Sequence, residues 1–134
     1  MKHHVIIALG TNVNEWKIKE AQKIIKSISD DFSFSQTIQT EPIGKCFQNT
    51  MFYNALAVGT VGEIQPSELV CTLKKMEHAC GDNAQLRKKG TVVIDLDLLK
   101  YDSLIFHEAD WNRPYIKKLV KDFSHSFKKD NLLL

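Results

Sequence analysis

The stretch TVVIDLDLL, residues 91–99, decides the fold that the sequence predicts. Successive side chains of a strand point to opposite faces of its sheet. One face would therefore be aliphatic and face a core: Val92, Ile94, Leu96 and Leu98. The other face would carry Asp95 and Asp97, which two strand rises separate by about 7 Å. We therefore expect a strand with one buried side and one side that presents two neighbouring carboxylates.

The patterns before this stretch alternate between strand and helix. The apolar run Val5–Leu9, closed by Gly10, is typical of a central strand covered on both faces. Apolar residues spaced by three and four predict helices over Trp16–Ser29 and Pro66–Cys80. Two further strands are expected over residues 32–38, with Phe32, Phe34 and Ile38 on one face, and over residues 52–61.

The resulting order, β-α-β-β-α-β, predicts an α+β fold of the ferredoxin-like class. In this arrangement a four-stranded antiparallel sheet has both helices on one face, so Asp95 and Asp97 would project from the open face. Residues 82–90 are expected to form a charged loop, and residues 117–123 a short helix. A chain of 134 residues fits a single domain over residues 1–134.

Composition argues against several classes of protein. A net charge of +2 gives no general attraction to nucleic acid or to an acidic membrane surface. No apolar run approaches the roughly 18 residues that a membrane span needs, so a cytoplasmic protein is expected by default. The three cysteines form no CxxC pair and the five histidines show no ligand spacing, so neither a disulfide framework nor a zinc site is predicted.

The two carboxylates of the last strand need a compensating cation, because like charges side by side repel each other. Mg²⁺ suits such a pair, since it is usually held by one or two carboxylates together with water and substrate phosphates. The alternative is a solvated strand face on which Lys or Arg side chains pair with Asp95 and Asp97.

A second pair of residues predicts a site for a planar ring. In the strand over residues 52–61, Phe52 and Asn54 share a face and offer a flat aromatic surface beside a carboxamide that donates and accepts hydrogen bonds. The alternative is that Phe52 belongs to the core and Asn54 closes a turn.

Five blocks of the sequence resemble the 6-hydroxymethyl-7,8-dihydropterin pyrophosphokinases of folate biosynthesis, over residues 4 to about 123. These blocks are Leu9-Gly10-Thr11-Asn12, Thr40-Glu41-Pro42-Ile43-Gly44, Phe52-Tyr53-Asn54-Ala55, Met76-Glu77 and Ile94-Asp95-Leu96-Asp97-Leu98-Leu99. The resemblance implies a ferredoxin-like fold and a Mg²⁺-dependent transferase that moves pyrophosphate from ATP to the reduced pterin. Its partners would be these small molecules, and a monomer is expected.

The resemblance also implies roles for individual residues. Asp95 and Asp97 would bind two Mg²⁺ ions, and Lys121 is assigned with them to catalysis. The pterin would be bound, with its ring between Phe52 and Phe123, by Thr40, Pro42, Ile43, Phe52, Asn54 and Phe123. The nucleotide would be bound by Glu77, Arg87, Lys88, Leu98 and Tyr115.

Two alternatives to this activity follow from the sequence. Positions where the family usually has arginines or a Gly-Pro-Arg segment hold Asp82, Ala84 and residues 90–92, and Tyr115 stands where a histidine is usual. A relative that binds pterin or nucleotide without the transfer would fit these departures. An RNA-recognition module shares the ferredoxin-like sheet, but Asp95 and Asp97 would repel RNA phosphates.

Overall fold

The computed structural model describes residues 2–42 and 50–126. Its helices and strands follow one another along the chain in this order: β1 His3–Thr11, α1 Trp16–Ile25, β2 Ser33–Phe34, β3 Ile38–Thr40, β4 Phe52–Val61, α2 Pro66–Ala79, α3 Ala84–Lys88, β5 Asp95–Tyr101, β6 Leu104–Ile105, the 3-10 helix η2 Glu108–Asn112 and α4 Pro114–Ser126. None of the helices within these described ranges is long and apolar enough to cross a membrane.

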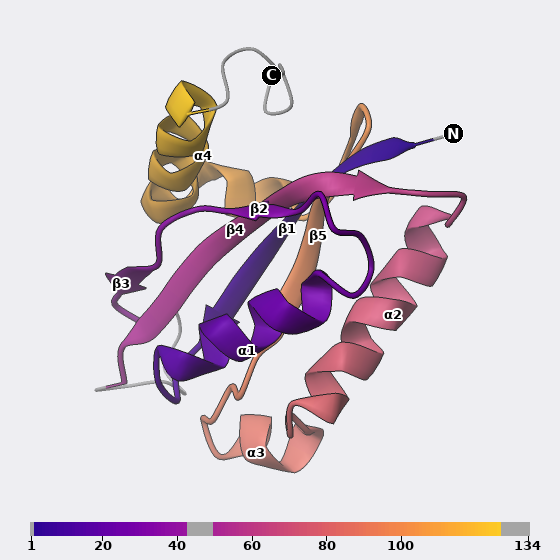
Figure 1. Cartoon of the computed structure of the whole chain (residues 1–134). Coiled ribbons are helices and arrows are strands. Elements are labelled where there is room, and N and C mark those ends of the chain that lie inside the picture. Colours follow the sequence, from indigo (N-terminus) through magenta and orange to yellow (C-terminus); the bar gives the residue numbers. More distant parts are fainter. Residues whose placement is uncertain (1, 43–49, 127–134) are drawn as a thin grey trace.

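The strands form one antiparallel sheet in the order β2-β4-β1-β5-β6, with β3 also paired to β4 (Figure 1). Strand β1 lies in the middle and pairs along its length with β4, from His3 opposite Val61 to Thr11 opposite Tyr53. The α+β, ferredoxin-like order of elements is therefore confirmed. The described residues form six strands instead of the expected four, because the strand expected over residues 32–38 is divided into β2 and β3 and the short strand β6 is added.

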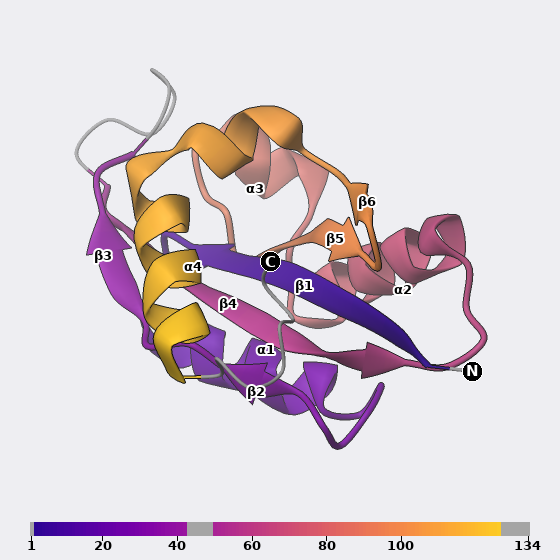
Figure 2. The ribbon, with the colours of Figure 1, turned by 90° about the horizontal axis from the view of Figure 1, so that it is seen from above.

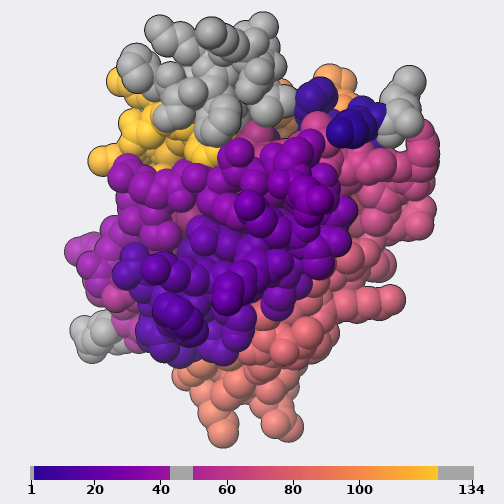
Figure 3. Space-filling model, in the orientation of Figure 1, coloured from indigo at the N-terminus to yellow at the C-terminus, as the bar shows by residue number. Residues whose placement is uncertain are grey.

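Helices α1 and α2 cover one face of the sheet, as expected. Ile18 and Ile25 of α1 and Leu69 and Leu73 of α2 pack with alternate residues of β1 and β5, such as Leu96, in one buried cluster. In a space-filling view of this side, α1 and the segment after it cover the sheet, with α2 beside them (Figure 3).

The expectation that the opposite face is open is wrong for part of that face. Helix α4, which is longer than the predicted residues 117–123, packs against it through Ile116, Leu119 and Phe123, which bury Ile6 and Leu99 of the sheet (Figure 2). Since α4 covers one part of this face only, a hollow remains beside it, over the ends of β1, β4 and β5.

The strand predicted over residues 32–38 is interrupted. The Ser35 hydroxyl accepts a hydrogen bond from the amide of Leu56, at 2.8 Å, and so takes a place that a backbone carbonyl would have in a continuous ladder. The alternation of faces is lost there. Phe32 and Phe34 accordingly contact the core under α1 and α2, whereas Ile38 contacts the core under α4.

Strand β5 begins at Asp95, four residues later than expected, because side chains bind the preceding backbone. The amide of Val92 donates to Asn12 at 2.7 Å, and the amide of Val93 donates to Asp82 at 2.9 Å. The predicted charged loop over residues 82–90 contains the short helix α3, which the side chain of Asn83 caps through the amide of Leu86.

Candidate active site

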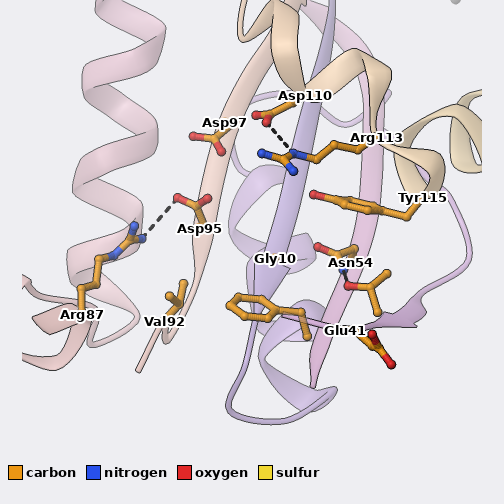
Figure 4. A pocket seen from close by; sticks show the side chains of 12 residues that line it. Gly10, Glu41, Asn54, Arg87, Val92, Asp95, Asp97, Asp110, Arg113 and Tyr115 are labelled. Atoms are coloured by element: carbon orange, nitrogen blue, oxygen red, sulfur yellow. Dashed lines mark hydrogen bonds and ion pairs between the residues drawn. The ribbon is translucent and has the colours of Figure 1, made fainter. Parts of the chain in front are cut away.

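A pocket of about 320 Å³ lies beside α4, on the sheet face opposite α1 and α2 (Figure 4). It is bounded by the ends of β1 and β3, the starts of β4 and β5, the end of α3 and the segment between β6 and α4. Its lining residues are Gly10, Thr40, Glu41, Phe52, Asn54, Arg87, Val92, Asp95, Asp97, Asp110, Arg113 and Tyr115. Acidic residues gather on one side and an aromatic ring and a carboxamide on another, so the pocket has two chemically different parts.

Asp95 and Asp97 line the pocket from β5, and cations of α2 and α3 lie against them. The Arg87 Nη2 donates to Asp95 Oδ1 at 3.3 Å. The ammonium of Lys74 lies 3.9 Å from Asp95 Oδ1 and 3.6 Å from Asp97 Oδ1. Lys74 also donates to Glu77 at 3.0 Å, and Glu77 in turn accepts the amide of Leu96 at 2.7 Å. The carboxylates are therefore partly neutralised by the protein itself.

The two carboxyl groups have shifted pKa values of opposite sign. Burial and the negative charge of Asp95 raise the pKa of Asp97 to about 7. Burial alone would also raise the pKa of Asp95, but the hydrogen bond with Asp97 and the charges of Arg87 and Lys74 lower it. In the absence of a metal ion, the pair thus keeps a proton to higher pH than two separate carboxyl groups would.

The other part of the pocket is a platform with fixed polar groups. Phe52 opens β4 and is only partly buried, and Asn54, two residues further on the same face, is 7% exposed. The Asn54 amide donates to the Thr40 hydroxyl at 2.7 Å, which fixes the carboxamide. Gly10 lies opposite Asn54 in β1, where a Cβ atom would come within 3.3 Å of the Asn54 oxygen. A planar ligand ring stacked on Phe52 would therefore lie beside the fixed carboxamide of Asn54.

Comparison with known proteins agrees with this arrangement. The family model of 7,8-dihydro-6-hydroxymethylpterin-pyrophosphokinase matches residues 6–125. The chain belongs to this family. It is also 34% identical, over 142 aligned residues, to the folate synthesis bifunctional protein of Arabidopsis thaliana. That alignment covers 95% of this chain but 28% of the relative, so the chain spans little more than a quarter of that protein's length.

Seven of the fourteen site residues predicted from the resemblance to the pyrophosphokinase family line the pocket. They are Thr40, Phe52, Asn54, Arg87, Asp95, Asp97 and Tyr115. Glu77 lies behind the pocket wall, 5% exposed, at 3.7 Å from Arg87. It therefore contacts the site through its neighbours and does not face the cavity.

Five predicted site residues are not brought to this pocket. Phe123 is 4% exposed and packs in the core under α4, so the structure does not place it opposite Phe52. Leu98 is buried on the face toward α1 and α2. Lys88 and Lys121 are exposed on α3 and α4 and do not line the pocket, and neither does Pro42. Ile43 lies outside the described residues.

Several residues of this site had no role predicted from the sequence. Asp110 and Arg113 line the pocket from the segment before α4, whose sequence has no periodicity that would have marked it. Lys74 reaches the two aspartates from α2, where its place in a helical charge pattern indicates only a solvated face. Glu41 also lines the pocket, from the segment in which Thr40, Pro42 and Ile43 were predicted to bind the pterin, and Val92 lines it from a position predicted for the core.

The residues present fit a divalent cation that prefers oxygen ligands. Four carboxylates line the pocket against two guanidinium groups, so the lining is net negative. A triphosphate would enter such a pocket only with additional cations. Ligand atoms of Asp97, His107 and Asp110 also lie within 4.8 Å of one another, which adds candidate ligands beside the predicted pair.

Proposed function

We propose that this protein transfers the terminal two phosphates of ATP, as a pyrophosphoryl group, to the hydroxymethyl oxygen of 6-hydroxymethyl-7,8-dihydropterin in folate biosynthesis. The observation that carries the proposal is that Asp95 and Asp97 face the same pocket as Phe52 and Asn54. One pocket thus combines carboxylates suited to cations that accompany phosphates with a platform suited to a flat heterocycle. Membership of the pyrophosphokinase family supports the same reaction.

In this reaction the hydroxymethyl oxygen forms a bond to the β-phosphorus of ATP. The bond from that phosphorus to the oxygen shared with the α-phosphate breaks, AMP leaves with this oxygen, and the hydroxyl proton passes to water. Phosphoryl transfers of this kind depend on positioning and on neutralising charge more than on covalent help from the protein. The task of the site is therefore to align two substrates and to supply positive charge.

Different residues of the pocket would align the two substrates and supply the positive charge. Phe52 would stack on the pterin ring, and Asn54, fixed by Thr40, would hydrogen-bond its edge. Asp95 and Asp97 would hold Mg²⁺, which supplies positive charge to the phosphates when bound. Arg87 and Tyr115 lie at the pocket wall and would contact the nucleotide.

The test is to incubate the protein with ATP, Mg²⁺ and the reduced pterin and to measure AMP and pyrophosphorylated pterin by chromatography. We expect both products in equal amounts, with their formation abolished by EDTA. Asp95→Asn should lower the rate by at least about 100-fold, by loss of metal-assisted charge stabilisation. Asp30→Asn, a change at an exposed acid, is the matched control and should leave the rate unchanged.

Two results would contradict the proposal. If the wild-type protein binds pterin but forms no AMP above a blank, the family member that binds without transfer is the correct alternative. If Asp95→Asn retains full activity, the carboxylates serve as salt-bridge partners of Lys74 and Arg87 and do not hold the cation.

A further inference from the structure

We infer that Lys74 of α2 is a fixed cation of this site, which takes the place of one of the two divalent ions expected at Asp95 and Asp97. The inference rests on the proposed function, because it concerns the carboxylates that would hold the cation in that reaction. It departs from the resemblance to the pyrophosphokinase family, which implies two Mg²⁺ ions and gives Lys74 no role.

The ammonium of Lys74 lies among three carboxylates. It donates to Glu77 Oε2 at 3.0 Å, and it lies 3.6 Å from Asp97 Oδ1 and 3.9 Å from Asp95 Oδ1. The ammonium is therefore close to one oxygen atom of each aspartate at the same time. A metal ion that bridged the two aspartates through these oxygen atoms would have to compete with it.

Glu77 holds Lys74 in this position. Glu77 is 5% exposed, and the oxygen atom that accepts the Lys74 ammonium, Oε2, also accepts the amide of Leu96 at 2.7 Å. Because Leu96 stands between the two aspartates in β5, this bond fixes the Glu77 carboxylate at the level of the site. An ion pair on a free surface loses much of its energy to side-chain entropy, whereas here one partner is already immobile. The ammonium is thus a permanent part of the site.

Lys74 approaches the two aspartates from the side of α2, which runs beside β5 (Figure 1). Asp95 and Asp97 line the pocket, but Lys74 is not among the described residues that do so. The carboxylates therefore have one side toward the ammonium and another toward the pocket. A divalent ion that arrives with the phosphates of a nucleotide has the pocket side available to it.

An ammonium at this place can supply the charge of one metal ion and exclude it. The head group of lysine is a compact point charge with three donors. A second divalent ion would be repelled by it over a few ångström. The same two oxygen atoms are also close to other cationic or basic nitrogens, since Arg87 Nη2 lies 3.3 Å from Asp95 Oδ1 and His107 Nε2 lies 3.8 Å from Asp97 Oδ1. We therefore expect one divalent ion per bound nucleotide.

The number of bound metal ions tests this inference without any transfer reaction. Mn²⁺ replaces Mg²⁺ as the probe, and the nucleotide is α,β-methylene-ATP, an ATP analogue whose pyrophosphoryl group cannot be transferred. Bound ions are counted by electron paramagnetic resonance. Two Mn²⁺ ions about 3.5–4 Å apart, the spacing of two-metal sites, give a spin-coupled spectrum that a single ion does not give. The wild-type protein should bind one ion per nucleotide and show no coupling.

Three variants separate the charge of Lys74 from any structural role. Lys74→Met keeps the length of the side chain and should bind two ions with a coupled spectrum. Without nucleotide, it should bind Mn²⁺ at least about 10-fold more tightly than wild type, because a repelling charge is gone. Lys74→Arg keeps the charge and should bind one ion. Lys75→Met, at the next and exposed position of α2, is the matched control and should also bind one ion.

Other counts would overturn the inference. Two ions in the wild-type protein would show that Lys74 leaves room for both, and no bound ion would show that the pocket side does not hold one. One ion in both wild type and Lys74→Met would make Lys74 a salt-bridge partner only, a role that lowers stability in urea without changing the count. Since 46% of the Lys74 side chain is exposed, its variants are expected to fold. If the count rises from one to two but the wild type forms no AMP with the reduced pterin, the inference holds and the proposed function fails.

Discussion

Replacing Asp97 by asparagine should stabilise the metal-free protein above pH 7 and leave its stability unchanged below pH 4. Burial and the adjacent Asp95 raise the pKa of Asp97 to about 7 from its ordinary value of 3.8. Between these two values the folded protein keeps a proton that the unfolded chain has lost. The free energy of unfolding therefore decreases as pH rises from about 4 to about 7, and the asparagine variant, which has no titrating proton at this position, lacks this decrease.

The size of the effect follows from the same two values. The difference between 3.8 and about 7 corresponds to about 4 kcal/mol at 1.36 kcal/mol per pKa unit. The lowered pKa of Asp95 offsets part of this, because the hydrogen bond with Asp97 and the charges of Arg87 and Lys74 stabilise its ionised form in the folded protein. We therefore expect Asp97→Asn to raise the free energy of unfolding by about 1–3 kcal/mol at pH 8.

Urea unfolding in EDTA, at pH values from 4 to 8, measures this effect. The stability curves of wild type and Asp97→Asn should coincide near pH 4 and separate up to pH 7. Asp30→Asn, at an exposed position, should follow wild type throughout. A constant difference at all pH values, or a loss of stability at pH 8, would refute the view that Asp97 is held at an electrostatic cost for binding a cation.

Other substitutions separate the pocket from the core that supports it. Phe52→Ala should weaken pterin binding by about 1–3 kcal/mol in a fluorescence titration and leave affinity for the ATP analogue unchanged; an equal loss of both would contradict the stacking role. Phe123→Ala should destabilise the protein by about 3–5 kcal/mol in urea, because its ring is buried under α4; unchanged stability would show that it does not pack there. Gly59→Ala should cost about 1–3 kcal/mol, because the new methyl would lie 2.9 Å from the backbone of Phe32. Gly62→Ala, where nothing lies within 4 Å, is its control, and equal effects would exclude the clash.

The fold was predictable because its strongest signals are local. The run Val5–Leu9 alternates between two cores in the structure, with Val5, Ile7 and Leu9 under α1 and α2 and Ile6 under α4, which is why every position is apolar. The strand over residues 32–38 was mispredicted because a single hydroxyl, that of Ser35, enters the ladder. A pattern of apolar residues does not show such a side-chain bond.

The site was predictable where its residues lie on strands. Phe52 and Asn54 share a face by the period of two, and Asp95 and Asp97 do so by the same rule. Arg113 and Asp110 could not be found in this way, because they reach the pocket from a segment without periodicity. Phe123 was assigned to the pterin from the resemblance, whereas the helix that carries it packs its ring into the core.

The electrostatics of the site and the integrity of the sheet depend on the same side chains. Strand β6 pairs with β5 only at Lys100 and Tyr101, so the outer edge of β5 beside the carboxylates lacks a neighbouring strand among the described residues. Side chains of α2 and α3 bind that edge instead: Glu77 accepts the amide of Leu96, and Arg87 donates to the carbonyl of Ile94.

Those two side chains also determine the charge around the aspartates. Arg87 donates to Asp95, and Glu77 holds Lys74 within 4 Å of both Asp95 and Asp97. Another strand could also satisfy the backbone groups at the outer edge of β5. Such a strand would bring no cations to the carboxylates. By binding the edge with charged side chains, this fold keeps two acids side by side at the pocket and places the cations Lys74 and Arg87 against them.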